Sequence, residues 1–223
     1  MTVAEAFKAI SDDEARSHLE RYFGLGEWTG NEYAGSHFDS FGVNGKVAFT
    51  SDDLISVSCL SVHVPAPAAL GILGHCSAEI TALLERIPND VALQDIPLDE
   101  HDTYFGEDSP CLLLWRLLRA QDAQRWGVGA TTASKLIARK RPALVPIYDS
   151  VVARVTGFKD STGTWRAWHE AFATDLELLG RLEALRSTIG RDDLSLLRIL
   201  DIVLWMHGSQ GAEILENVEQ EVG

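Results

Sequence analysis

The sequence RWGVGATTAS at residues 125–134, followed by PALVPIYDSVVARV at residues 142–155, contains the most informative pattern of the chain. Gly127 and Gly129 lie between two stretches of helical periodicity, and they permit the tight backbone of a short turn between helices. Such a turn directs amide N–H groups outward at the start of the second helix, where they can hold a phosphate oxygen. We therefore predict a helical hairpin and a following helix within residues 111–159.

The segment after the hairpin places an aspartate at the start of that following helix. Pro142 and Pro146 end the preceding helical pattern, so the helix predicted at about residues 147–155 carries Asp149 near its beginning. A carboxylate beside a sugar that develops positive charge stabilises it electrostatically, which a neutral side chain cannot do. The alternative role of Asp149 is a helix N-cap, which its position after a proline-rich turn also favours.

These two strings resemble the helix-hairpin-helix superfamily of DNA glycosylases (HhH-GPD, endonuclease III-like), whose Gly-Val-Gly hairpin leads through a proline to an Asp-x-x-Val-x-Arg-Val helix. The resemblance implies a two-lobed, all-α fold in which Asp149, at the mouth of the cleft, stabilises the sugar cation and orients the attacking water. Relatives that also nick DNA carry a lysine at the position of Thr131, so a monofunctional enzyme is implied. The whole chain also resembles an actinobacterial family of unknown function.

The resemblance further implies a DNA-binding face around the hairpin. The residues predicted to contact phosphates or DNA are Gly127, Val128, Gly129, Thr131, Thr132, Lys135, Arg139, Lys140, Arg141 and Arg154. Two structural alternatives remain open. Cations in the last turn of a helix stabilise its dipole, which also explains the run of residues 139–141. A solvated surface lysine is the ordinary explanation for Lys135, although it could lean toward the cleft.

The charge distribution is uneven. The net charge of −14 opposes nucleic-acid binding, because phosphate contacts dominate the affinity of such complexes. Residues 116–159 nevertheless hold nine Lys and Arg against two Asp, a local balance of +7, which leaves −21 for the rest of the chain. Since salt screens exposed charges beyond roughly 8 Å, this segment could form a local anion-binding face. Alternatively, its cations pair with surrounding carboxylates.

Aromatic residues supply candidates for a pocket that accepts a flipped base. Residues 24–50 are rich in Gly, Asn and Ser, which predicts an ordered irregular loop able to present aromatic side chains. The pocket candidates are Trp28, Tyr33, Phe38, Trp126 and Tyr148. Any single one of them could instead cover the hydrophobic core.

Helical periodicity and capping signals predict one all-α domain over residues 1–223. The expected helices are residues 3–23, 51–62, 77–87, 111–121, 130–140, 147–155, 165–177, 179–187 and 194–207, the last stopped by Gly208. On that last helix, the spacing of Arg198 and Asp201 suits a partly buried structural ion pair, with the alternative that Asp201 faces the cleft. The acidic residues 88–109 are expected to form a solvated loop, and Lys46–Phe49 is the one short strand candidate.

The remaining composition argues against export, membrane insertion and metal binding. Residues 1–20 lack a basic and apolar leader, and the apolar runs are shorter than the roughly 20 residues that span a bilayer. Cys59, Cys76 and Cys111 are too few and too widely spaced for a disulfide framework or an iron–sulfur cluster. His75 beside Cys76 lacks a second ligand pair. We therefore expect reduced thiols in a cytoplasmic protein, with no metal and no cofactor.

Three functions are compatible with these patterns. The first is a monofunctional N-glycosylase that excises a modified or damaged base from DNA. The second keeps the bond chemistry but acts on a free nucleoside or nucleotide, which the net charge of −14 favours. The third is a non-catalytic helical module that binds DNA or a protein partner. The base, the oligomeric state and the pathway are left open by the sequence.

Overall fold

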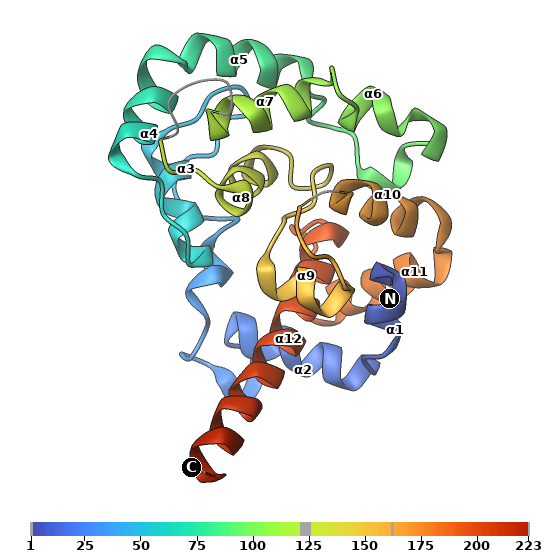
Figure 1. Ribbon diagram of the computed structural model, residues 1–223. Coiled ribbons are helices and arrows are strands. Elements are labelled where there is room, and N and C mark those ends of the chain that lie inside the picture. The colour runs from blue at the N-terminus through green and yellow to red at the C-terminus, as the bar shows by residue number, and fades with distance from the viewer. Residues whose placement is uncertain (1, 121–125, 162, 223) are drawn as a thin grey trace.

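The computed structural model describes residues 2–120, 126–161 and 163–222, and the regular structure of this part of the chain is helical, without a strand (Figure 1). The all-α class is thus confirmed, and the strand candidate Lys46–Phe49 is wrong. The α-helices are α1 (Val3–Lys8), α2 (Asp12–Phe23), α3 (Ser51–Ser56), α4 (Ala66–Leu70), α5 (Ser77–Arg86), α6 (His101–Phe105), α7 (Pro110–Arg119), α8 (Ala130–Lys140), α9 (Ser150–Thr156), α10 (Thr164–Thr174), α11 (Leu176–Thr188) and α12 (Leu196–Val222).

Shorter helical turns complete the fold. They are the 3₁₀ turns η1 (Gly26–Trp28), η2 (Ala34–His37), η3 (Val57–Leu60), η5 (Leu93–Asp95) and η6 (Leu98–Glu100), and the π-helical turn η4 (Gly71–His75). Within the described residues, no single helix combines the length and hydropathy needed to cross a membrane. The segments Ala66–His75 and Ser77–Arg86, which meet at an angle of 71°, have the required length and hydropathy only when they are taken together.

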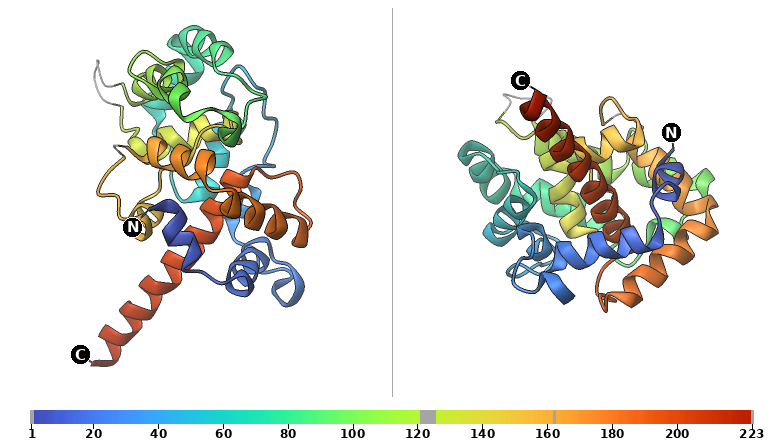
Figure 2. Two further views of the ribbon diagram at one scale, coloured as in Figure 1. Left: turned by 90° about the vertical axis from the view of Figure 1, so that its right-hand side faces the viewer. Right: turned by 90° about the horizontal axis from the view of Figure 1, so that it is seen from below.

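The two ends of the chain lie in the same half of the molecule (Figure 1). α12 packs against α2, α9 and α11, and α1 contacts α10 and α12. In the other half, α7 packs against both α5 and α8. The last turns of α12 extend away from the other helices (Figure 2). α12 therefore packs against α1 and α2, from the opposite end of the sequence, and against α9.

The first predicted helix is divided into two. Residues 3–23 were expected to form one helix, but α1 ends at Lys8 and α2 begins at Asp12. The hydroxyl of Ser11 accepts a hydrogen bond from the amide of Glu14 at 3.2 Å, which is the N-cap interaction that starts α2. Helical periodicity continues across the break because the apolar residues of both helices face the same core.

The acidic segment of residues 88–109 is not the solvated loop that its charge predicts. It contains η5, η6 and α6. Its apolar side chains enter the core, with Leu93 fully buried and Ile96 and Phe105 nearly so. The prediction was wrong because it was based on the many acidic residues of this segment. These residues lie between a few apolar residues that are buried in the core, and those apolar residues determine the structure.

α12 continues past the glycine that was predicted to end it. A Cβ at Gly208 would lie 2.6 Å from Cγ2 of Val155 and 2.7 Å from Cγ1 of Val151. Both valines belong to α9, which packs against α12. Gly208 therefore allows α9 and α12 to approach each other closely and is not a C-cap. α12 continues to Val222.

We expect Gly208→Ala to lower the free energy of unfolding by about 1–3 kcal/mol, because the new methyl group overpacks the contact with α9. Urea denaturation followed by circular dichroism measures this loss. Gly180→Ala in α11 is the matched control, since a Cβ there meets no atom of the described residues within 4 Å. That variant should gain about 0.5–1 kcal/mol from helix propensity. Similar gains in both variants would contradict the packing role of Gly208.

Candidate functional site

The two glycines of the predicted hairpin precede α8, which packs against α7. Gly127 has a φ of +90°, a region that glycine adopts without steric cost, and a Cβ here would approach Pro65 to 3.0 Å. Val128 is buried and anchors the turn, whereas Gly127 and Gly129 are exposed. Gly129 is the N-cap residue of α8, and no side chain of the described residues caps that helix. Arg125, at the start of the quoted hairpin string, lies outside the described residues.

The segment that leads to Asp149 is fixed to α8. Ser134 lies in α8, and its hydroxyl accepts a hydrogen bond from the amide of Tyr148 at 3.0 Å. The same hydroxyl donates to the carbonyl of Thr131 at 2.9 Å. The chain then turns into α9, which begins at Ser150, three residues later than the sequence predicts. This arrangement sets the position of Asp149 relative to α8.

Two different groups hold the carboxylate of Asp149. Its Oδ1 accepts a hydrogen bond from the amide of Val151 at 2.9 Å, so the predicted N-cap role is confirmed. Its Oδ2 accepts one from the Lys135 ammonium, also at 2.9 Å. That ammonium donates in addition to the carbonyl oxygen of Leu60 at 2.9 Å. The side chains of Lys135 and Asp149 are 4% and 13% exposed. Because each carboxylate oxygen has two acceptor positions, each keeps one for a further ligand.

Asp149 and Lys135 face a cleft of about 400 Å³. Its lining residues come from α2, η2, η3, α8, the start of α9 and α12, and from the segments next to them. Its lining consists of Tyr22, Tyr33, Ala34, Gly35, Cys59, Leu60, Ser61, Val62, Thr131, Lys135, Ile147, Asp149, Ser150, Val151, Arg198, Asp201, Ile202 and Trp205. The volume falls in the usual range for small-molecule sites.

Three aromatic side chains form one wall of this cleft. Tyr22 and Tyr33 are stacked, with ring centroids 5.8 Å apart and planes 7° from parallel. Trp205 packs edge-on against Tyr33, with centroids 5.8 Å apart and an interplanar angle of 83°. The wall joins α2, the loop after it and α12, so its rings come from both ends of the sequence. Flat apolar surfaces of this kind suit a planar ring.

A buried ionic cluster lies at the base of the cleft. Arg198 donates to Asp201 at 2.6 Å, as its spacing predicts, and also to Asp39 at 2.9 Å and to the hydroxyl of Tyr22 at 2.8 Å. Burial raises the pKa of Asp201 to about 6; the charge of Arg198 opposes this shift, and Asp149 adds to it. Burial also raises the pKa of Tyr22 to about 12. The cleft therefore contains two carboxyl groups in different electrostatic environments, at positions 149 and 201.

Comparison with known proteins identifies the family of the chain but no individual relative. Residues 15–208 match a family described as a family of unknown function, DUF6308. The chain belongs to DUF6308. No curated protein and no solved structure matches it. The matched region includes every residue of the cleft lining, from Tyr22 to Trp205. The family description names no activity, so the chemistry of this DUF6308 cleft has to be argued from its own side chains.

Among the predicted pocket aromatics of this DUF6308 chain, Tyr33 lines the cleft and the other four lie elsewhere. Phe38 is buried in the core. Trp28 packs under the guanidinium of Arg21, with 5.2 Å from that group to the ring centroid. Trp126 donates from its indole to the carbonyl of Leu118 at 2.6 Å. Tyr148 lines a separate groove together with Trp115 and Trp165.

The predicted DNA contacts of the last turn of α8 are wrong. Arg139, Lys140 and Arg141 are 2–4% exposed, and their charged groups are bonded inside the protein. The carboxylate of Asp53, itself fully buried, pairs with Arg139 at 3.4 Å and with Lys140 at 2.5 Å. Other acceptors for these three cations are carbonyl or amide oxygens of Phe38, Phe41, Asn44, Gly45, Lys46, Leu84, Ile87 and Lys140. The last turn of α8 therefore presents no cationic face to DNA.

The other predicted contacts are distributed over different surroundings. Lys135 is buried against Asp149 and is not the solvated lysine of the structural alternative. Thr131 lines the cleft and Thr132 is buried. Arg154 is exposed in the last turn of α9. The DUF6308 structure thus brings Thr131 and Lys135 to Asp149 and leaves Gly127, Gly129 and Arg154 on the surface.

Two aromatic residues of the cleft were not predicted from the sequence. Tyr22 and Trp205 form the aromatic wall with Tyr33, although they are almost the whole chain apart. Tyr22 carries only the signal of an apolar position on a helix, and Trp205 lies in the most apolar helix of the chain. Both signals are typical of core residues, so the pattern alone does not separate them from the core.

Proposed function

We propose that this protein hydrolyses the N-glycosidic bond of a nucleoside or nucleotide, with Asp149 as the catalytic carboxylate. The observation that carries the proposal is the carboxylate of Asp149, fixed by the amide of Val151 and the ammonium of Lys135, in a cleft of about 400 Å³ with an aromatic wall. The resemblance of residues 127–155 to the helix-hairpin-helix glycosylases supports the same assignment.

Asp149 acts on the sugar. As the bond between C1′ and the base nitrogen breaks, its electron pair leaves with the base and the sugar becomes an oxocarbenium-like cation. The carboxylate stabilises this cation and accepts the proton of the water whose oxygen bonds to C1′. Lys135 is a positioning residue, because its ammonium fixes the carboxylate to α8 and to Leu60.

Asp201 supplies the proton to the leaving base. It lines the cleft, and its pKa of about 6 keeps a substantial fraction protonated in mildly acidic solution. A carboxyl group that can donate a proton to the base and a second carboxylate that faces the sugar, both in one site, are the arrangement that bond cleavage with leaving-group protonation requires. The aromatic wall of Tyr22, Tyr33 and Trp205 stacks the base.

The pH dependence of turnover tests the role of Asp201. A general acid works in its protonated form, and the carboxyl of Asp201 titrates at about 6 instead of its ordinary value of 3.8. We therefore expect kcat/KM to fall as the pH rises through about 6, and Asp201→Asn to lower the rate and remove this fall. A wild-type profile that stays flat or rises between about pH 5 and about pH 8 contradicts this role.

The buried cations favour a small substrate over DNA. With Arg139, Lys140 and Arg141 inside the protein, three cations of the basic segment are unavailable to phosphates, and the net charge of the chain is −14. We propose to incubate the protein with ribo- and deoxyribonucleosides, their monophosphates, and duplexes that carry modified bases, and to quantify free base by chromatography. Release from nucleosides or monophosphates is expected. Release of free base from duplexes alone would contradict the proposed small substrate. It would still support the proposed cleavage of the N-glycosidic bond.

DNA is the second candidate substrate, favoured by the exposed hairpin. Gly127 and Gly129 are exposed, and no side chain of the described residues caps the first turn of α8, so its amides are available to a phosphate. Binding to a fluorescent duplex over a range of salt concentrations tests this candidate. Each phosphate contact steepens the dependence of log K on log salt by about 0.9, so a slope near zero would exclude it.

A further inference from the structure

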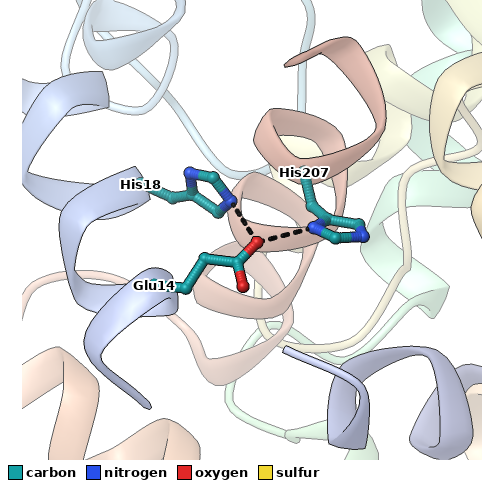
Figure 3. Close-up of side chains that lie close together, drawn as sticks. All are labelled: Glu14, His18 and His207. Atoms are coloured by element: carbon teal, nitrogen blue, oxygen red, sulfur yellow. Dashed lines mark hydrogen bonds and ion pairs between the residues drawn. The ribbon is translucent and has the colours of Figure 1, made fainter. Parts of the chain in front are cut away.

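Three potential metal ligands converge where α2 meets α12. Glu14 and His18 lie one turn apart on α2, and His207 comes from α12, 189 residues further along the sequence. Figure 3 shows both imidazole rings directed at the same carboxylate oxygen of Glu14. That oxygen lies 2.9 Å from Nδ1 of His207 and 3.4 Å from Nε2 of His18. The three ligand atoms all lie within 4.8 Å of one another.

The buried histidine supplies a second, independent observation. The side chain of His18 is 5% exposed, and the only polar contact of its Nε2 atom within the described residues is the long one of 3.4 Å to the Glu14 carboxylate, which does not meet hydrogen-bond geometry. A buried polar atom with only a long contact recovers little of the interaction with water that it loses on burial. Mere packing of the histidine would leave most of this loss uncompensated. A bound cation at the centre of the cluster would supply the missing interaction.

We propose that Glu14, His18 and His207 form a binding site for a divalent transition-metal ion, with Zn²⁺ as the best fit. Two imidazole nitrogens and one carboxylate oxygen are a common zinc ligand set, and imidazole disfavours Mg²⁺ and Ca²⁺, which select oxygen ligands. Tetrahedral ligands at about 2.0–2.1 Å from Zn²⁺ are about 3.3 Å from one another. Of the two separations from the Glu14 oxygen, 3.4 Å matches this spacing and 2.9 Å is shorter than it.

The fourth position of this site is open to water. The side chains of Glu14 and His207 are each 41% exposed, whereas His18 closes the inner side. None of the three belongs to the described lining of the cleft. The ion would join α2 to α12 next to the aromatic wall, since Tyr22 lies one turn after His18 and Trp205 two residues before His207. Its role is structural, and the site is independent of the proposed hydrolysis.

The test uses the full-length chain after removal of metals with a chelator and dialysis. Titration with Zn²⁺ in a calorimeter is expected to give one tight equivalent, and Zn²⁺ is expected to raise the melting temperature. His207→Ala and Glu14→Gln change exposed side chains, and each is expected to weaken binding at least about 10-fold and to remove the thermal shift. Melting of both variants in the presence of the chelator verifies that they are folded.

His37→Ala is the matched control. His37 is also exposed and lies 3.9 Å from a carboxylate oxygen of Glu32, but the described residues place no second imidazole beside this pair. We expect the His37→Ala variant to bind Zn²⁺ with the affinity of the wild type. Co²⁺ should give the visible bands of a four-coordinate site without a thiolate charge-transfer band. Unchanged binding in His207→Ala and Glu14→Gln, a loss confined to Cys76→Ser, or no stoichiometric binding in the wild type would each overturn the proposal.

Discussion

Asp149→Asn is expected to lower turnover at least about 100-fold while the protein stays folded, because asparagine caps a helix as well as aspartate does but carries no charge. The neutral amide cannot stabilise a sugar cation, so kcat falls, whereas KM changes little because the base still stacks on the aromatic wall. The loss of the contact with Lys135 is expected to lower the free energy of unfolding by about 3 kcal/mol, because the buried ammonium loses its counter-charge and keeps only the carbonyl of Leu60. Base release and urea denaturation measure the two effects.

Asp175→Asn is the control for this substitution. Asp175 is also an N-cap aspartate, whose side chain accepts from the amide of Leu178 at 3.0 Å and pairs with Lys8 at 2.9 Å, but it lies at the start of α11, outside the described lining of the cleft. The control should keep wild-type turnover. If Asp149→Asn also keeps more than half of the turnover, or if the wild type releases no base from any substrate, the protein acts as a binding module and the catalytic assignment fails.

The local signals in this sequence predict local structure well. The bounds of α8 agree with the predicted residues 130–140, because Gly129 and Pro142 mark both of its ends. The position of Asp149 at the start of a helix follows from the prolines before it, and the structure places it at the N-cap of α9. Each of these predictions depends on residues within a few turns of one another.

The predictions that failed depend on contacts between distant parts of the chain. The run of residues 139–141 was interpreted from its own charges, but its burial is determined by Asp53 and by carbonyl groups of residues 38–46 and 84–87. Lys135 reaches Asp149 only because α8 and the start of α9 are folded onto each other. Gly208 looks like a helix stop until α9 is seen to pack against it. The sequence alone identifies the charged residues and the glycine, but not the residues that contact them in the folded chain.

Asp53→Asn tests the interpretation of the basic segment as an internal cluster. Asp53 is fully buried and pairs with both Arg139 and Lys140. Its replacement leaves these buried cations without a counter-charge, and removing one partner of such a cluster costs about 3–5 kcal/mol of unfolding free energy. We expect a loss of this size in urea denaturation monitored by circular dichroism. A loss this large is a substantial fraction of the stability of an ordinary domain, about 5–15 kcal/mol.

Asp52→Asn is the neighbouring control, because Asp52 is only partly buried and accepts a hydrogen bond from the amide of Val43 at 2.8 Å, which asparagine can also accept. Its loss should stay below about 1 kcal/mol. In the Asp53→Asn background, Lys140→Met removes one of the unpaired charges and should recover part of the stability, since the two substitutions act on one contact. Additive losses in the double variant, or a loss below about 1 kcal/mol for Asp53→Asn alone, would mean that Arg139 and Lys140 are solvated, and their DNA contacts would again be possible.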